Sequence, residues 1–250
     1  MLRVHPHVVF EVLAFFIGFR YFLRLRKQQA DPIAAPNRVW IIIGATAGAL
    51  LGSWLLGALE NPALFFQGGG EVGLLYYYQQ KTIVGALLGG LICVELTKKW
   101  IGVRVSSGDL FTFPLILGIL IGRIGCFLAG VEDGTHGLPS GLPWAMDLGD
   151  GVLRHPAPLY EILFLALLWL GLYLTEQSYI LADGVRFKLF MVSYLLFRLA
   201  VDALKPGFRF DIGLTIIQIA CILGLIYYYA VFVYPKRLVV GKRSVRGVPT

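Results

Sequence analysis

The sequence contains seven separate apolar runs, each long enough to cross a lipid bilayer. A helix needs about 20 mostly apolar residues to span the hydrocarbon core. The runs lie at 8–24, 39–59, 82–97, 108–129, 156–175, 184–204 and 212–234. Hydrophobic residues form 57% of the 250 residues, more than soluble domains usually carry. The sequence therefore predicts an all-α integral membrane protein, a single polytopic domain over 1–250 with about seven transmembrane helices.

The basic residues between these runs predict the orientation of the chain. They are concentrated in 24–38, 98–107, 180–188 and a basic tail at 235–250, and basic connections stay in the cytoplasm. The N-terminus is then outside, and 130–155 is a long outer loop between the fourth and fifth helices, rich in Gly, Pro and Asp, which favour turns. The net charge of +7 is thus explained by the basic connections expected on the cytoplasmic side of the membrane. A nucleic-acid partner is not expected, because no basic run is interleaved with exposed aromatic residues.

Five ionisable residues lie well inside the outer half of the expected membrane layer. Each costs at least about 2.5 kcal/mol near the bilayer centre unless it is paired or hydrated. Arg123 and Arg198 share a depth of about 10 Å below the outer surface, and Gln218 adds a polar group at a similar level. This arrangement predicts a polar chamber open to the outer leaflet. The five residues are Glu11, Arg123, Glu161, Arg198 and Asp202.

These charges have two interpretations. Arg198 and Asp202 are spaced i and i+4 and can form a structural pair, and Glu161 can neutralise Arg123 from the fifth helix. Two guanidinium groups at one depth also suit a phosphate, which guanidinium binds with two parallel hydrogen bonds. A lipid headgroup at the outer surface would supply that phosphate.

Glycines recur at a spacing of four in the second and fourth runs. Small residues at this spacing let membrane helices approach closely, so we expect them to serve helix packing. They are Gly44, Gly48, Gly52, Gly118 and Gly122.

Three motifs together resemble one known family, the prolipoprotein diacylglyceryl transferases. They are G-R-I-G at 122–125 followed by C-F-L-A-G, R-H-P-A-P-L-Y-E at 154–161, and F-R-L-A-V-D-A-L-K-P at 197–206. The resemblance covers most of the chain in order. It implies transfer of the diacylglyceryl group of phosphatidylglycerol to the lipobox cysteine thiol of a preprolipoprotein signal peptide, with release of glycerol phosphate. It also implies a multi-pass protein of the bacterial inner membrane and no metal or cofactor.

The resemblance also assigns the site residues. It implies catalytic roles for Arg123, Arg198, His155 and Glu132, with Asp133 as the other choice for the loop acid. The phosphatidylglycerol-binding residues would be Arg123, Arg198, Cys126, Gly134, Arg154, Tyr160, Glu161 and Asp202.

Three positions depart from the family pattern. Cys126 replaces an asparagine, Val84 stands where a histidine is usual, and Phe10 replaces a tyrosine. The proton of the thiol then has His155 or His136 as candidate acceptors. The departures keep a catalytically silent lipid-binding homologue open as an alternative. A small-solute transporter is disfavoured, because transport sites lie near the midplane between repeats.

Overall fold

The computed structural model describes residues 6–62 and 81–242. Arg3 and the end of the basic tail, 243–250, lie outside these residues. The chain forms two compact units, each described separately below. The first unit comprises Met1–Ala30, Ser106–Ser193 and Tyr228–Thr250, and the second comprises Asp31–Val105 and Tyr194–Tyr227.

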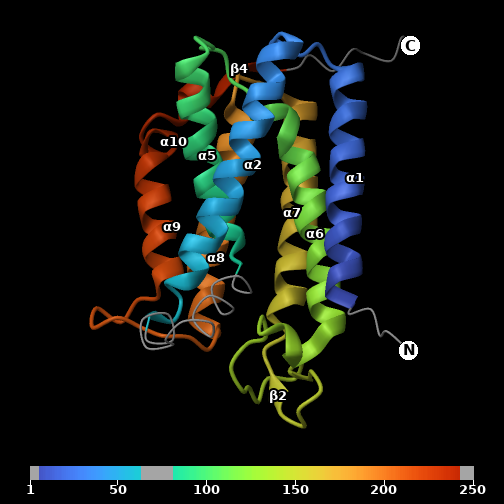
Figure 1. The fold of residues 1–250 in the computed structure, drawn as a ribbon, viewed down its shortest axis with the longest axis vertical. Coiled ribbons are helices and arrows are strands. Elements are labelled where there is room, and N and C mark those ends of the chain that lie inside the picture. The colour runs from blue at the N-terminus through green and yellow to red at the C-terminus, as the bar shows by residue number, and fades with distance from the viewer. Residues whose placement is uncertain (1–5, 63–80, 243–250) are drawn as a thin grey trace. The chain divides into compact units, whose positions relative to one another are not determined.

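Three long helices form the first unit: α1 (Pro6–Gln28), α6 (Asp109–Ala129) and α7 (Ala157–Ser178). Helix α6 packs against both α1 and α7 (Figure 1). Helices α1 and α6 are antiparallel, because Phe22 stacks on Phe111 at 4.2 Å between ring centroids near one end, whereas Gly125 packs against Phe10 near the other. The start of α1, the end of α6 and the start of α7 therefore meet at one end of the unit.

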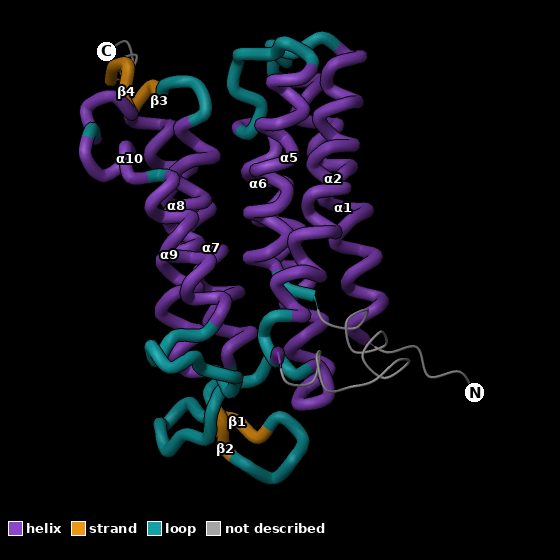
Figure 2. The backbone as a smooth tube through the Cα atoms, turned by 60° about the vertical axis from the view of Figure 1, so that its left-hand side comes forward, coloured by secondary structure: helices purple, strands orange, loops and turns teal. Residues whose placement is uncertain are grey.

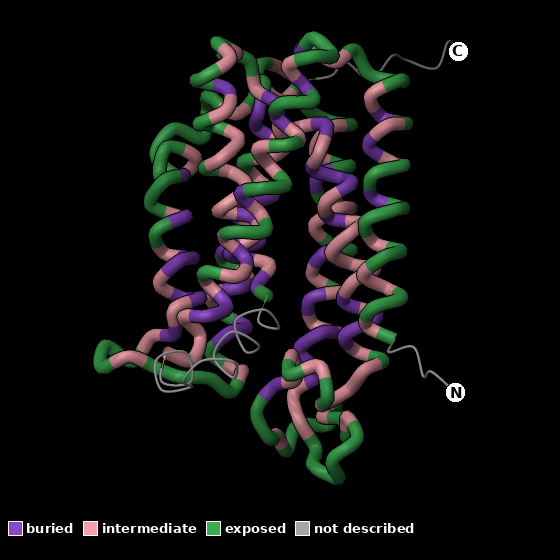
Figure 3. The backbone as a smooth tube through the Cα atoms, in the orientation of Figure 1, coloured by how far each residue is buried: buried purple, intermediate pink, exposed green. Residues whose placement is uncertain are grey.

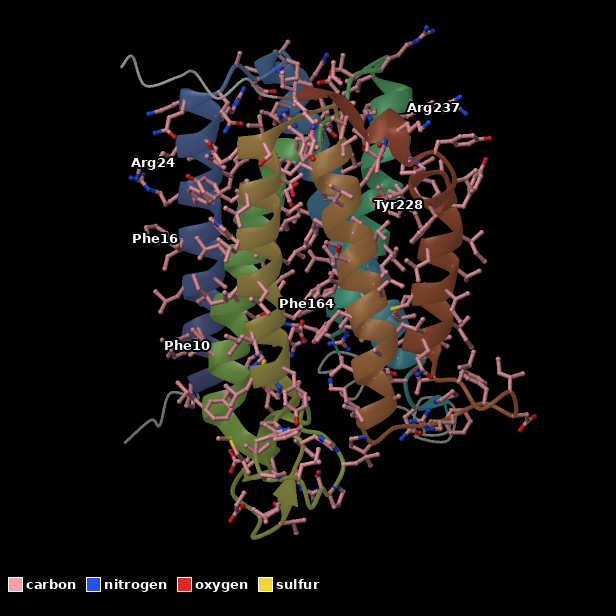
Figure 4. All side chains as sticks on the ribbon, turned by 180° about the vertical axis from the view of Figure 1, so that it is seen from behind. Phe10, Phe16, Arg24, Phe164, Tyr228 and Arg237 are labelled. Carbon is pink, nitrogen blue, oxygen red and sulfur yellow. The ribbon has the colours of Figure 1, made fainter. Side chains whose placement is uncertain are left out.

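Helix α1 buries only a narrow face. Its buried residues are Gly18, Phe22 and Leu25, and the rest of its surface is largely exposed (Figure 3). Phe16 and Arg24 project from the side of α1 that faces away from α6 (Figure 4). Exposed phenylalanine along a helix is costly in water and favourable in lipid, so this surface suits a bilayer.

Two short two-stranded sheets lie at opposite ends of the first unit (Figure 2). At one end, β1 (Met146–Asp147) pairs antiparallel with β2 (Leu153–Arg154), after the 3₁₀ turn η1 (Gly130–Asp133). Asp147 Oδ1 accepts backbone hydrogen bonds from Gly149, Asp150 and Gly151 at 2.8, 3.1 and 3.0 Å, which fixes the turn. Residues 134–155 thus fold as turns and a hairpin without an α-helix, as expected.

At the other end, β3 (Tyr179–Leu181) follows α7 directly and pairs antiparallel with β4 (Val239–Lys242). The pairing joins the connection after the fifth expected span to the start of the expected tail. Asp109 anchors the same end, because its carboxylate accepts hydrogen bonds from the backbone N–H groups of Gly184 and Phe187 at 2.6 and 3.1 Å.

The second unit is built on close contact between α2 (Ala35–Ala58) and α5 (Ile83–Trp100). A Cβ atom added to Gly48 would overlap the carbonyl oxygen of Gly89, and one added to Gly52 would overlap that of Gly85. Glycine therefore lets the two backbones touch, which confirms the packing role expected of the α2 glycines. Thr82 caps α5 by accepting a hydrogen bond from Gly85 N at 3.1 Å.

The remaining helices complete both units. Helix α8 (Val185–Val201) begins in the first unit and ends in the second, and the 3₁₀ turn η2 (Asp202–Leu204) continues it. Helix α9 (Ile216–Tyr227) packs against α5. In the first unit, α10 (Tyr229–Val233) and the 3₁₀ turn η3 (Pro235–Leu238) lead to β4.

The expected spans and the helices agree for most of the chain. Within 6–62 and 81–242, three helical stretches are long and apolar enough to cross a membrane: Ala35–Ala58, Asp109–Asp133 and Ala157–Ser178. Within the apolar run at 212–234, the longer helix covers Ile216–Tyr227. Tyr228, with φ −92° and ψ 14°, leaves the α-helical conformation and separates α9 from α10. The packing role expected of Gly122 is wrong, because an added Cβ would meet nothing within 4 Å among residues 6–62 and 81–242.

Candidate functional site

Arg123 is the central cation at the end of the first unit where α1, α6 and α7 meet. It belongs to α6 and is only 6% exposed. Its Nε lies 2.9 Å from Glu161 Oε2 on α7, and Glu161 is itself 3% exposed. The neutralisation of Arg123 by Glu161, inferred from the sequence, is therefore present. A paired, buried guanidinium is held in a fixed orientation, which suits geometry-specific recognition.

Cys126 links Arg123 to a histidine that the sequence analysis missed. Arg123 Nη1 donates to Cys126 Sγ at 3.5 Å, one helical turn along α6. The same sulfur lies 3.7 Å from Nδ1 of His7, at the start of α1. Asp133 Oδ1 lies 2.5 Å from that nitrogen. His7, Cys126 and Asp133 bring three potential metal-ligand atoms within 4.8 Å of one another.

The loop acid that joins this cluster is Asp133. Its carboxylate is 6% exposed, and Oδ2 also accepts a hydrogen bond from Thr135 Oγ1 at 2.7 Å. Glu132 is exposed on η1. Gly134 ends that turn with φ 67°, a left-handed conformation that favours glycine. Of the two candidate loop acids, Asp133 is therefore the one that lies beside the α6 cysteine.

His155 and Tyr160 form a second, neighbouring group in the same unit. His155 Nδ1 lies 3.1 Å from Tyr160 Oη, which also accepts a hydrogen bond from Trp144 Nε1 at 2.9 Å. These contacts attach the hairpin loop to the start of α7. Arg154 is in turn held by Asp150 through hydrogen bonds of 2.9 and 2.6 Å. The hydrogen bond from Arg154 lowers the pKa of the exposed Asp150 carboxyl.

Arg198 and Asp202 lie in the second unit and form the i, i+4 pair expected from their spacing. Arg198 Nη2 lies 3.8 Å from Asp202 Oδ1, and both residues are about 5% exposed or less. Thr215 Oγ1 donates a short hydrogen bond to the other Asp202 oxygen. Gln218, the polar residue noted on the last span, accepts from Thr215 N at 3.0 Å and donates to Leu199 O at 3.3 Å. The pair is thereby fixed to both α8 and α9.

The three residues that depart from the family motifs lie in different surroundings. Val84 is fully buried in α5. Phe10 packs on Gly125, where an added Cβ would lie 2.6 Å from the Phe10 Cβ. Cys126 is the only one of these three that joins a polar group. His7 escaped notice because it lies at the edge of the first apolar run, although its i, i+4 spacing to Glu11 was a usable signal; the two side chains approach to 3.9 Å.

Comparison with known proteins identifies the family. A model of the prolipoprotein diacylglyceryl transferase family matches residues 1–234. A Methylococcus capsulatus protein named phosphatidylglycerol–prolipoprotein diacylglyceryl transferase is 31% identical over 247 residues, covering 88% of this chain and 87% of the relative. Proteins of the same name are 32% identical in Nitratidesulfovibrio vulgaris (78% and 72% covered) and 25% identical in Campylobacter hominis (93% and 87%). The chain belongs to the prolipoprotein diacylglyceryl transferase family.

Proposed function

We propose that this chain transfers the diacylglyceryl group of phosphatidylglycerol to the lipobox cysteine thiol of preprolipoproteins and releases glycerol phosphate. The family match over 1–234 and the name shared by relatives that cover most of the chain support this function. The observation that supports a specific site for this reaction is the buried Arg123, which is oriented by Glu161 and contacts Cys126.

The reaction explains why a fixed guanidinium is needed at this place. Phosphatidylglycerol carries one negative charge on its phosphodiester, and the phosphate gains a second as the bond to the diacylglyceryl group breaks. A preorganised cation stabilises that developing charge. We therefore propose Arg123 as the residue that binds the phosphate, Gly134, Arg154 and Tyr160 as further contacts of phosphatidylglycerol, and His155 as a catalytic candidate beside them.

Arg198 is proposed to bind the same phosphate, on the strength of its sequence motif. Its pairing with Asp202 serves the same purpose as the Arg123–Glu161 pair, since a neutralised arginine can be buried and still donate hydrogen bonds. Glu132 and Cys126 are retained as proposed contacts of the headgroup or the peptide.

The proposed setting is the bacterial inner membrane, with seven spans in a single domain over 1–250. The N-terminus and the loop 130–155 lie outside, and the tail lies in the cytoplasm. The loop would admit the lipobox peptide to the outer leaflet, where phosphatidylglycerol is also reached. The basic residues of 24–38, 98–107 and 180–188 support this orientation.

The function is tested with purified protein, phosphatidylglycerol and a lipobox peptide. We expect glycerol phosphate and a thioether-linked peptide in equal amounts. Arg123→Lys keeps the charge but loses the paired donors, so we expect at least a tenfold lower rate. Arg24→Ala, an exposed arginine on α1 (Figure 4), is the matched control and should keep the rate of the unmodified protein.

A catalytically silent homologue remains the second candidate, because Val84, Cys126 and Phe10 replace polar family residues. It predicts that phosphatidylglycerol binds and that Arg123→Ala abolishes binding, while neither product appears. Absence of both binding and products would contradict the two lipid functions together.

A further inference from the structure

The proposed reaction requires a proton acceptor, since a thiol becomes a good nucleophile only as the thiolate. Three chain segments converge beside the phosphate-binding Arg123: the start of α1, the end of α6 and the turn η1. They supply His7, Cys126 and Asp133. The role that we assign to this cluster rests on the proposed function.

We propose that His7 is the catalytic base that takes the proton of the lipobox thiol, and that Asp133 is its positioning residue. Asp133 Oδ1 lies 2.5 Å from His7 Nδ1, a direct hydrogen-bond distance. The carboxylate is 6% exposed and is held from its other oxygen by Thr135. This contact places the ring proton on Nδ1 and leaves the lone pair on Nε2.

The exposure of the three side chains fits these roles. The His7 side chain is 37% exposed, whereas Asp133 and Cys126 are buried. A substrate thiol therefore reaches the imidazole more readily than the other two groups. Glu11 Oε2 lies 3.9 Å from His7 Nε2, so a carboxylate stands next to each ring nitrogen.

The position of His7 relative to Arg123 matches the two ends of the reaction. Both side chains contact the sulfur of Cys126, at 3.7 and 3.5 Å. Arg123 serves the leaving phosphate and His7 the attacking thiol, and the reacting carbon must lie between these groups. The base and the charge-stabilising donor both lie where α1 packs against α6. This contact holds them in the mutual orientation that such a step needs.

The thiol proton moves to His7 Nε2, and the sulfur attacks the glyceryl carbon that carries the phosphate. A C–S bond forms while the C–O bond breaks, and its electron pair goes to the phosphate oxygen. The glycerol phosphate leaves with the proton that His7 returns to it or to solvent, so the enzyme is regenerated without an oxidant, reductant or further reactant.

A metal site built from the same three residues fits the geometry less well. Ligands bound to zinc at about 2.0–2.1 Å in a tetrahedral arrangement have N and O atoms roughly 3.3 Å apart. The 2.5 Å separation of His7 Nδ1 and Asp133 Oδ1 is well below this. Arg123 also places a positive charge 3.5 Å from Cys126 Sγ, which opposes a dication at that sulfur.

The test compares His7→Gln with His155→Gln, Asp133→Asn and Phe16→Ala in the full-length protein. Glycerol phosphate release is measured from pH 5.5 to 9.5 with phosphatidylglycerol and a lipobox peptide. A general base contributes roughly 100-fold to 10,000-fold, so we expect His7→Gln to lower kcat at least 100-fold at pH 7 and to change KM for phosphatidylglycerol less than about twofold. Asp133→Asn should lower kcat less, and Phe16→Ala, an exposed α1 residue, should leave it unchanged.

The pH profile separates catalysis from a structural role. His7 lies next to Asp133, Glu11 and Cys126, and Cys126 in turn contacts Arg123. In His7→Gln we expect kcat to recover as the pH approaches the thiol pKa of about 8.5, because the peptide then ionises by itself. A variant that is merely misfolded does not recover.

Three results would overturn the assignment while leaving the proposed function intact. They are unchanged kcat in His7→Gln, a 100-fold loss in His155→Gln with His7→Gln unaffected, and stoichiometric zinc whose removal abolishes activity. Lack of product from the unmodified protein at every pH contradicts the proposed function itself.

Discussion

At the residue scale, removing one partner of the Arg123–Glu161 pair is predicted to cost more stability than removing one partner of an exposed ion pair of the first unit. Both side chains are buried, and removal of one partner leaves an uncompensated buried charge, which typically costs about 3–5 kcal/mol. We expect Glu161→Leu to lower the free energy of unfolding by about that amount. Thermal or denaturant unfolding in detergent micelles measures it.

The double variant Arg123→Met with Glu161→Leu is the control for that prediction. Replacement of a whole buried pair by apolar side chains is often neutral or stabilising, so we expect most of the lost stability to return. Activity should stay absent, because the phosphate has lost its guanidinium. If the double variant is as unstable as the single one, the pair is not the source of the loss.

The sequence predicted Arg123 and its partner well, because both lie in short motifs and a buried charge demands an opposite charge. It could not predict that His7 meets Cys126, 119 residues away. That contact depends on the register of α1 against α6, which Gly125 sets by admitting Phe10. The choice between Glu132 and Asp133 was equally out of reach, since it depends on the 3₁₀ geometry of η1.

A second residue-scale prediction concerns Asp150, whose pKa is lowered by its hydrogen bond from Arg154. A lowered folded-state pKa contributes stability above the unfolded-state value of about 3.9, and that contribution is lost as the pH falls through the folded-state pKa. We expect NMR titration of the Asp150 carboxyl to show a lower midpoint than in Arg154→Gln. Equal midpoints would contradict the assigned cause.

At the element scale, the contact between α2 and α5 should tolerate no added side chain. A Cβ at Gly52 or Gly89 would overlap backbone atoms of the facing helix, so the helices must separate. Overpacking typically costs about 1–3 kcal/mol, and we expect Gly89→Ala to lose at least this much in detergent unfolding. Gly171→Ala in α7 is the matched control, because a Cβ there meets nothing within 4 Å in the described part of the chain. It should be neutral or stabilising.

Hydropathy predicted the positions of the main helices because a bilayer requires each apolar run to satisfy its own backbone hydrogen bonds. It carried no information on the interruption at Tyr228, which lies within an unbroken apolar run. The strands were also missed. Two to four residues give too short an alternation to recognise, and β3 and β4 exist only through pairing of segments about 60 residues apart in the chain.

At the scale of the molecule, the length of one helix in the first unit bears on the membrane topology. Helix α7 has 22 residues and is therefore about 33 Å long, close to the roughly 30 Å of a hydrocarbon core. The β1–β2 hairpin precedes it, and β3 of the β3–β4 sheet follows it directly. If α7 crosses the bilayer, the hairpin and the sheet lie on opposite sides, and β4 places the start of the tail on the same side as the connection 180–188.

We therefore expect two introduced cysteines to be labelled from opposite sides of the membrane in intact cells. Gly141→Cys, exposed in the loop after η1, should react with a membrane-impermeant maleimide from outside, whereas Lys236→Cys should react only after the inner membrane is permeabilised. The unmodified chain is the control for background, since Cys126 and Cys221 are buried and Cys93 is partly so. Labelling of both positions from outside would place the hairpin and the sheet on one side and exclude α7 as a membrane span. Reversed labelling would keep the span but invert the orientation, and the proposed base His7 would then face the cytoplasm, away from a lipobox peptide that has already been exported.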